Sequence, residues 1–500
     1  MDKSNIKKIY SFLVFYSFVL LFFCSGSSPF IHFMSTDSSV FFTMGRGMVG
    51  GKVVYLDLFD HKGWYIYFFN YLGALISSDN SVGIYLVEGV FVSIDAILCY
   101  KIYYSYICSR KSVIATLVTL MLFLNYFTYQ GGNLVEVYAL TFQLLSFYYI
   151  VKYIKTNQIK HNPFFMLIHG ICVGVVLFLR ANMIMMWGSI ALIIIIYLFI
   201  NKKYTNLLIN IAAGFAGIII GVAPPVVYSV FTGSTYEMID QCFVFNVLYV
   251  SGGSLINNLF SSFHNITFNL VLLSGAVSVL LACISKRIHI LMKLLLASGF
   301  VLSSISVTFS PIKFEHYLEI IIPFFIPIIA LMINKLDLNH IRRKRFLFVL
   351  VVCGIFILSV CVNLRTPIKL FVTNNDSKEY IKTIDEISNE FLIEGNGTES
   401  VLVTNNNSAF YNAMKVIPKT KYFYTPLVDY HKYPYAIDEQ VKSIVSGDND
   451  VLIINYSDYQ NGIIYSDIAD NEKILNSIKQ NYYLKDEVNQ FQMWIKKKEG

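Results

Sequence analysis

A polar stretch near the N-terminus, residues 37–62, carries side chains that could perform acid–base and phosphate chemistry. Its ionisable members are aspartates, a histidine and cations, namely Asp37, Arg46, Lys52, Asp57, Asp60, His61 and Lys62. The segments on both sides are apolar, and charged groups placed among membrane spans are costly unless they line a functional site. We therefore interpret this stretch as an active-site loop and the rest of the chain as the scaffold that positions it.

The composition is that of a membrane protein. Of the 500 residues, 55% are hydrophobic and 14% are charged, whereas about a quarter of the residues are charged in soluble proteins. Apolar runs of membrane-spanning length recur along the sequence, which predicts a polytopic α-helical membrane protein. The net charge of +7 is modest, and we expect no nucleic-acid partner. The eight cysteines form no CxxC pair, which argues against a structural zinc site.

Eleven apolar runs are expected to cross the membrane. They are residues 9–24, 82–100, 113–129, 135–150, 164–179, 183–200, 207–231, 268–284, 289–309, 317–333 and 346–362. Lys and Arg are concentrated in every second loop, and this bias places those loops and the N-terminus in the cytoplasm. The first loop, 27–81, is then external, and its aromatic run 64–76 is predicted to lie along the membrane surface. The first run could instead begin a signal peptide, but no clean cleavage site follows it.

The composition changes after residue 366, where polar and charged residues predominate. Strand-like runs alternate with candidate helices in this region; the strands are expected at 401–404, 422–424 and 451–455, and the helices near 377–392, 436–446 and 471–481. This alternation predicts a small α/β domain. The expected division is therefore a transmembrane domain, 1–365, and a second domain, 366–500, on the same external side as loop 27–81.

The order of the charged motifs resembles the GT-C class of membrane glycosyltransferases. The resemblance is strongest to the bacterial branch related to protein O-mannosyltransferases and the lipid A aminoarabinose transferase. Asp37 follows the first span in TDSSVFFTMGRGM, and about twenty-five residues later the turn DHKGW contains Lys62. Glu136 opens a later span in GGNLVEVYAL, and Arg180 ends another in FLRAN. Trp64 stands where this branch usually has a proline. The resemblance covers residues 1–365.

The resemblance implies a polyprenyl-phosphate sugar as donor, with Asp37 and Glu136 as catalytic acidic residues and Lys62 and Arg180 on the lipid phosphate. The chemistry agrees with these residue types, because an attacking hydroxyl needs a base and a leaving phosphate needs fixed positive charge. Arg46 is a further candidate for the phosphate. The candidate substrate contacts are Asp57, Asp60, His61, Lys313, His316 and Tyr317.

Each of these residues also has a purely structural interpretation. Asp37 could cap a helix that begins at Ser38, and Lys62 and Arg180 could anchor in the membrane interface. Glu136 could simply be solvated at the water boundary. The sequence specifies no cofactor, and a divalent cation is left open.

We therefore predict an enzyme of the bacterial cell membrane that moves a sugar from a polyprenyl-phosphate donor to a hydroxyl. The acceptor would be a cell-envelope glycan, lipid or protein on the outer face. A polytopic glycan polymerase or ligase is one alternative, although the arginines expected of it are missing from the external loop 232–267. A flippase or transporter is the other, for which Glu88 and Asp95 inside the run 82–100 are candidates.

Overall fold

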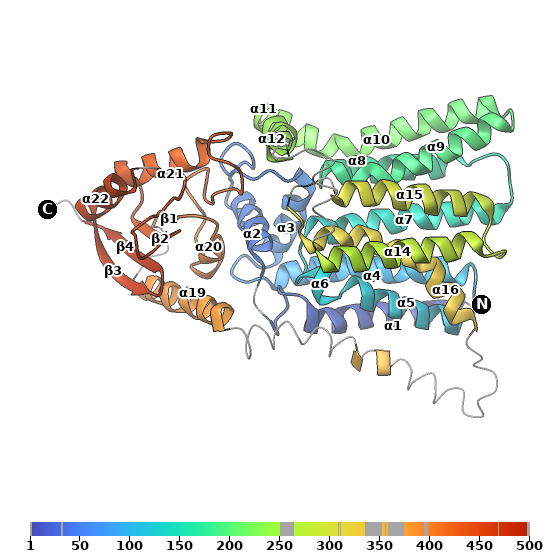
Figure 1. Cartoon of the computed structure of the whole chain (residues 1–500), viewed down its shortest axis with the longest axis horizontal. Helices are drawn as coiled ribbons and strands as arrows, with labels where there is room; N and C mark the ends of the chain where they lie inside the picture. The colour runs from blue at the N-terminus through green and yellow to red at the C-terminus, as the bar shows by residue number, and fades with distance from the viewer. Residues whose placement is uncertain are drawn as a thin grey trace. The chain divides into compact units, whose positions relative to one another are not determined.

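The structure is a computed structural model whose contacts divide the chain into two compact units (Figure 1). It describes residues 3–31, 34–250, 265–308, 310, 312–335, 353–355, 357–358, 375–394, 399–468 and 470–497. Unit 1 comprises Met1–Ile31, Tyr85–Tyr228 and Gly252–Thr366, and unit 2 comprises His32–Ile84, Ser229–Ser251 and Pro367–Gly500.

Unit 1 is a helical bundle whose long apolar helices run side by side (Figure 1). Its elements are α1 (Lys3–Cys24), α4 (Val82–Tyr104), α5 (Ser109–Phe123), α6 (Tyr126–Tyr129), α7 (Val135–Thr156), α8 (Pro163–Leu177), η1 (Ala181–Ile184), α9 (Met185–Ile200), α10 (Tyr204–Thr232), α14 (Ile266–Ile284), α15 (Ile290–Thr308), η3 (Glu315–Phe325) and α16 (Ile326–Lys335). Within the described residues, eight helices are long and apolar enough to cross a membrane, and α8 is a shorter apolar helix. The polytopic helical prediction is therefore confirmed. The count of eleven spans stays a prediction, since 346–362 lies almost wholly outside the described residues.

The expected run 113–129 is broken in the structure. α5 ends at Phe123, and α6 begins at Tyr126 because Asn125 caps it by accepting hydrogen bonds from Phe127 N (2.9 Å) and Thr128 N (3.2 Å). Asparagine is among the strongest N-cap residues. A hydropathy run alone does not reveal such a polar interruption.

Close packing between α8 and α10 depends on small residues. A Cβ atom at Gly217 would lie 2.2 Å from Leu167 O, far inside the contact distance. Small residues at membrane helix interfaces permit this approach of backbones, which dispersion forces then stabilise.

Glu88, a candidate transporter residue, is buried in α4 and held by hydrogen bonds within unit 1. Its carboxylate accepts from Ser25 Oγ (2.7 Å), Tyr129 Oη (2.6 Å) and Asn133 N (2.9 Å). A buried carboxylate with several donors is satisfied where it stands. The network ties α4 to the segments that follow α1 and precede α7, which favours a structural role for Glu88.

Unit 2 combines the first loop with the C-terminal region, so the compact units do not follow the expected division at residue 365. Its elements are α2 (Thr36–Val49), α3 (Trp64–Ile76), α11 (Thr235–Ile239), α12 (Phe245–Val250), α19 (Asn375–Glu394), β1 (Val401–Val403), α20 (Ala409–Ala413), α21 (Tyr435–Ser446), β2 (Val451–Asn455), α22 (Asn471–Asn481), β3 (Tyr482–Val488) and β4 (Phe491–Lys496). The helix α3 forms over the predicted range 64–76 and is short for a crossing. It packs tightly on α2, where a Cβ at Gly45 would lie 2.5 Å from the backbone of Asn70.

The C-terminal sheet confirms the predicted α/β domain. Its strand order is β1-β2-β4-β3, with β1 parallel to β2, and β4 antiparallel to both of its neighbours. Leu452 and Trp494 belong to one core with Ile444 of α21 and Ile478 of α22. Figure 1 shows α21 and α22 on one side of the sheet and α19 on the other.

One predicted strand is wrong. Residues 422–424 have no strand conformation, because this segment packs against the first loop instead of pairing with a strand. Phe59 N donates a hydrogen bond to Lys421 O (3.0 Å), and the Phe59 ring lies 4.7 Å from the Tyr422 ring. These contacts join the first loop to the C-terminal region within unit 2.

Candidate active site

Asp60, His61 and Lys62 form a connected row of side chains at the end of the first loop. Asp60 is only 2% exposed, and its carboxylate accepts hydrogen bonds from Tyr424 Oη (2.6 Å), Tyr67 Oη (2.9 Å) and the His61 backbone N (2.7 Å). His61 Nδ1 faces Asp60 Oδ1 at 3.2 Å, and Lys62 Nζ lies 2.7 Å from His61 Nε2. A buried carboxylate is thus linked through an imidazole to a partly exposed ammonium.

Protonation states in this row follow from its geometry. Burial raises the pKa of the Asp60 carboxyl, but hydrogen bonds and the charges of His61 and Lys62 outweigh it and lower the pKa to about 2. Burial, followed by the charge of Lys62, lowers the pKa of His61, so its ring is neutral at pH 7. Because an ammonium can only donate, Nε2 accepts from Lys62 and the ring proton sits on Nδ1, toward Asp60. The carboxylate therefore orients the imidazole, which in turn orients Lys62.

Asp37 lies in the first turn of α2. Ser35 is the N-cap of this helix, and its side chain accepts from Ser38 N at 3.4 Å, so the capping interpretation of Asp37 is wrong. Asp37 is half-buried, and among the described residues no donor hydrogen-bonds its carboxylate. Its charge acts on both His61 and Tyr424, which places it near the row of Asp60, His61 and Lys62. The carboxylate is thus available to a ligand.

Arg46 and Asp57 hold the loop itself. Arg46 is 5% exposed, and its Nη1 donates to Tyr411 O (2.9 Å) and Val416 O (3.2 Å). A guanidinium buried against backbone carbonyls is poorly placed for the phosphate contact predicted from the sequence. Asp57 Oδ2 accepts from Val53 N (2.7 Å) and closes a turn, which matches the ordinary turn role considered for it.

In unit 1, three predicted site residues come together. Arg180 Nη1 lies 2.7 Å from Glu136 Oε1 in an ion pair, with side chains 17% and 1% exposed, respectively. The guanidinium carbon of Arg180 lies 3.8 Å from the centre of the Tyr317 ring, a cation–π contact. Glu136 is in the first turn of α7, Arg180 precedes η1, and Tyr317 is in η3. Glu136 is therefore a buried partner of Arg180 rather than a solvated carboxylate.

Two further candidates in unit 1 are held by local contacts. Lys313 Nζ donates to Thr308 O (2.8 Å) and Ser310 O (2.5 Å). His316 is buried, with Nδ1 3.0 Å from Gln130 Oε1. These contacts give both residues a structural part, and their predicted ligand contacts stay predictions.

No sequence pattern points to the residues that support Asp60. Tyr424 is 364 positions away along the chain, and no local pattern distinguishes it from the other tyrosines. Asn246 was also missed; its Nδ2 donates to His61 O at 2.8 Å. A metal role finds no support in the described part of the chain, where no three His, Cys, Asp or Glu side chains gather as ligands.

Comparisons with known proteins identify the fold. Residues 2–373 match a family model described as "Putative competence-induced protein Ccs4 N-terminal domain". No curated protein matches the chain. The crystal structure of ArnT from Cupriavidus metallidurans bound to undecaprenyl phosphate is similar over 99% of this chain and 98% of that one, with a TM-score of 0.65 at 11% identity.

A second solved structure is similar over less of its own length. The archaeal oligosaccharyltransferase AglB from Archaeoglobus fulgidus, in complex with an inhibitory peptide and a dolichol-phosphate, matches 99% of this chain and 74% of that one. The TM-score is 0.50 at 10% identity. ArnT and AglB are both GT-C enzymes, so the GT-C fold implied by the resemblance of the charged motifs is confirmed.

Proposed function

The chain belongs to the Ccs4 N-terminal-domain family and has the GT-C fold, and from this premise we propose that it is a membrane glycosyltransferase. It would transfer a sugar from a polyprenyl-phosphate donor to a hydroxyl of a cell-envelope glycan, lipid or protein on the outer face of the membrane. The observation that carries this proposal is the similarity to ArnT over nearly the full length of both chains.

Transfer requires an acceptor oxygen to attack the anomeric carbon while the bond from that carbon to the phosphate oxygen breaks. Asp37 is the proposed general base and takes the hydroxyl proton. Its half-buried carboxylate in the first turn of α2, with no donor among the described residues, supports this role. The released lipid phosphate carries the negative charge that develops during the reaction.

Lys62 and Arg180 are the proposed contacts of that phosphate. Each is a partly exposed cation whose position is fixed by a buried carboxylate. Asp60 positions Lys62 through His61, and Glu136 pairs directly with Arg180. Preorganised charge stabilises a leaving group without reorganisation during the reaction. Asp60, His61 and Glu136 then act as positioning residues.

The test is the variant Asp37→Asn in the full-length protein, with Asp79→Asn as the matched control. Asp79 is an exposed aspartate of the same unit. Loss of a positioned base lowers the rate by about two to four orders of magnitude. We expect the Asp37 variant to fold and to bind lipid-linked donor but to transfer almost nothing, while the control keeps parental activity.

The measurement is mass analysis of surface glycans, lipids and proteins from cells that lack the protein and from cells complemented with each variant. A sugar present with the parent and with Asp79→Asn, and absent with Asp37→Asn, supports the proposal. If Asp37→Asn restores the parental glycans in full, Asp37 is not the base. If the parent itself changes no glycan, lipid or protein, the proposed activity is wrong.

A further inference from the structure

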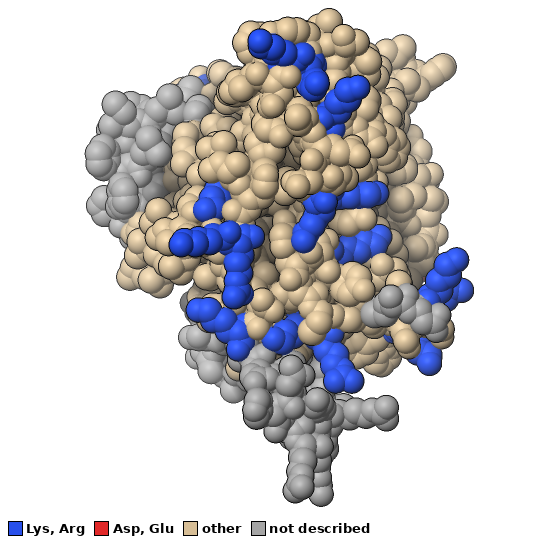
Figure 2. All heavy atoms as spheres, turned by 90° about the vertical axis from the view of Figure 1, so that its right-hand side faces the viewer, with Lys and Arg blue, Asp and Glu red and all other residues tan. Residues whose placement is uncertain are grey.

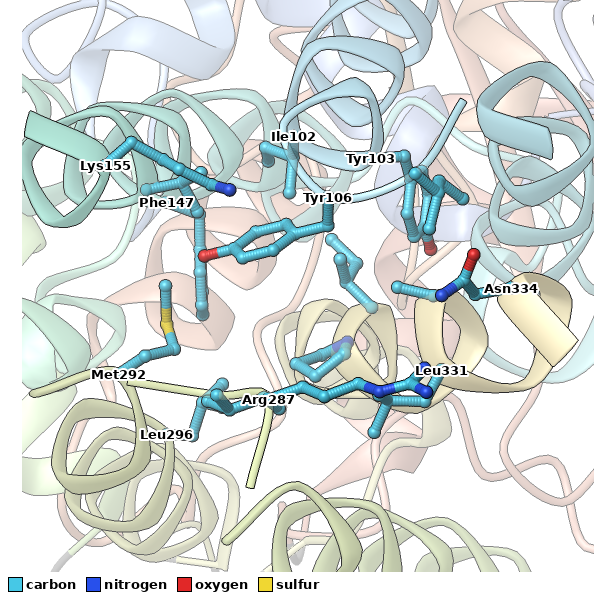
Figure 3. Close-up of a pocket in the computed structure, with 16 residues that line it drawn as sticks. Ile102, Tyr103, Tyr106, Phe147, Lys155, Arg287, Met292, Leu296, Leu331 and Asn334 are labelled. Atoms are coloured by element: carbon cyan, nitrogen blue, oxygen red, sulfur yellow. The ribbon is translucent and has the colours of Figure 1, made fainter. Parts of the chain in front are cut away.

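A cavity of about 270 Å³ opens among α4, α7, α15 and α16 of unit 1 (Figure 3). Its inner wall is apolar: Phe147, Met292 and Leu296 are each at most 5% exposed. Figure 3 shows Tyr106, Lys155 and Arg287 around this apolar interior. The cavity thus combines an apolar interior with the basic side chains of Lys155 and Arg287.

Among the described residues, the two cations have no acidic partner. Lys155 Nζ lies 4.6 Å from the centre of the Tyr106 ring, and within the described residues neither Lys155 nor Arg287 forms an ion pair. The described loops at this end of the bundle, 101–111, 152–162 and 285–289, contain Lys and Arg but no Asp or Glu. Figure 2 shows the same face, with blue Lys and Arg and no red Asp or Glu on its visible described surface.

The cavity is separate from the ion pair of Arg180 and Glu136. Glu136 and Lys155 lie in the first and last turns of α7. Nineteen residues of α-helix span about 28 Å, which is close to the thickness of a bilayer's hydrocarbon core. A ligand at Lys155 therefore lies at the opposite membrane surface from Arg180.

These features select one kind of ligand. An apolar cavity at a membrane surface takes a segment of an acyl chain, and a Lys and an Arg that have no acidic partner in the described part of the chain take a phosphate. The described part of this face offers a choline or ethanolamine ammonium no carboxylate, and the Tyr106 ring already faces Lys155. A soluble anion would use the cations but not the apolar interior.

We propose that this cavity binds an anionic phospholipid, with part of one acyl chain against Phe147, Met292 and Leu296 and the headgroup phosphate on Lys155 and Arg287. According to the topology predicted from the sequence, the lipid belongs to the cytoplasmic leaflet. The proposal is independent of the proposed glycosyltransferase activity.

Native mass spectrometry of the full-length protein tests the proposal, after reconstitution with phosphatidylglycerol or with phosphatidylcholine. The variants are Arg287→Gln combined with Lys155→Gln, and Ala330→Phe, which fills part of the cavity and keeps both cations. Lys286→Gln is the control, because it removes an adjacent exposed charge that does not line the cavity. Thermal unfolding of each variant verifies that it is folded.

We expect the parent and Lys286→Gln to retain phosphatidylglycerol and not phosphatidylcholine. The double variant should retain at least about tenfold less phosphatidylglycerol than the parent. The loss of one hydrogen bond to a charged group already weakens binding by about tenfold or more. Ala330→Phe should also lose the lipid. Equal retention of both lipids by the parent, unchanged retention in the double variant, or an equal loss in Lys286→Gln would overturn the proposal. Retention of added undecaprenyl phosphate in preference to phosphatidylglycerol would overturn it too, by assigning the cavity to another lipid.

Discussion

Replacing Asp60 with asparagine tests whether a buried carboxylate organises the end of the first loop. Asparagine keeps the shape of the side chain but removes the charge and turns one acceptor oxygen into an NH₂ donor. The carboxylate is 2% exposed, and among the described residues it accepts hydrogen bonds from Tyr424 Oη, Tyr67 Oη and His61 N, with His61 Nδ1 at 3.2 Å. Tyr67 Oη, which lies 2.9 Å from Asp60 Oδ2, then meets an NH₂ group in place of a charged acceptor, and Lys62 O at 3.0 Å is its remaining acceptor.

The expected loss of stability can be worked out in two ways. The environment lowers the pKa of Asp60 from 3.8 to about 2, and at 1.36 kcal/mol per pKa unit this preference for the ionised form amounts to about 2 kcal/mol. A hydrogen bond to a charged group contributes about 1.5–3 kcal/mol, and the variant removes the charge. Both values predict that Asp60→Asn lowers the free energy of unfolding by about 2 kcal/mol at pH 7.

The sign of the pH dependence follows from the lowered pKa. The contribution of Asp60 is fully present above pH 3.8, its unfolded value, and is lost as the pH falls toward 2. The parent and the variant should therefore differ at pH 7 and converge between pH 4 and pH 2.

Thermal unfolding of the full-length protein in nanodiscs, followed across this pH range, measures the difference. Asp79→Asn is the control, since Asp79 is exposed and its change should leave the melting temperature within error of the parent. Hydrogen exchange of residues 55–67 should rise in the Asp60 variant, because this segment carries the contacts that are lost. A melting temperature and exchange pattern equal to those of the parent at pH 7 would refute the proposed role of the carboxylate.

Two other predictions concern the phosphate and the topology. Lys62→Ala and Arg180→Ala should each weaken donor binding without unfolding the protein, and donor turnover equal to the parent in both would end their assignment to the phosphate. Cysteines introduced at the exposed positions Leu56 and Ser446 should react with an impermeant thiol reagent in whole cells, if 27–81 and 366–500 are external. The native, exposed Cys108 lies in a basic loop and should react only after lysis. Labelling of Ser446→Cys only after lysis would contradict the predicted topology.

The sequence predicts those features of the fold that depend on composition and local spacing. Apolar runs predicted the membrane helices, and the resemblance carried by the order of the charged motifs implied the GT-C fold. Strands that contain several polar or charged residues were predicted less well. β3 was not predicted because it contains the charged residues Lys485, Asp486 and Glu487. The strand lies at the edge of the sheet, where charged side chains are common.

Contacts between distant segments could not be predicted. Arg46 is typical of a phosphate ligand by its type and by its place in the loop, and only its contacts with Tyr411 and Val416 show that it is buried. Likewise, nothing near Asp60 in the sequence points to Tyr424. A single sequence gives residue types and local spacing, whereas burial depends on which segments pack together.

Burial divides the ionisable residues of the candidate site into two kinds, and the described residues of both units show the same arrangement. In unit 2, buried Asp60 orients half-buried Lys62 through His61. In unit 1, Glu136, 1% exposed, pairs with Arg180, 17% exposed. A cation held by a buried carboxylate has already lost much of its conformational freedom, so less entropy is lost when it binds a phosphate. Removing either carboxylate should therefore misplace a cation and weaken donor binding, whereas removing Asp37 should leave binding intact and stop transfer.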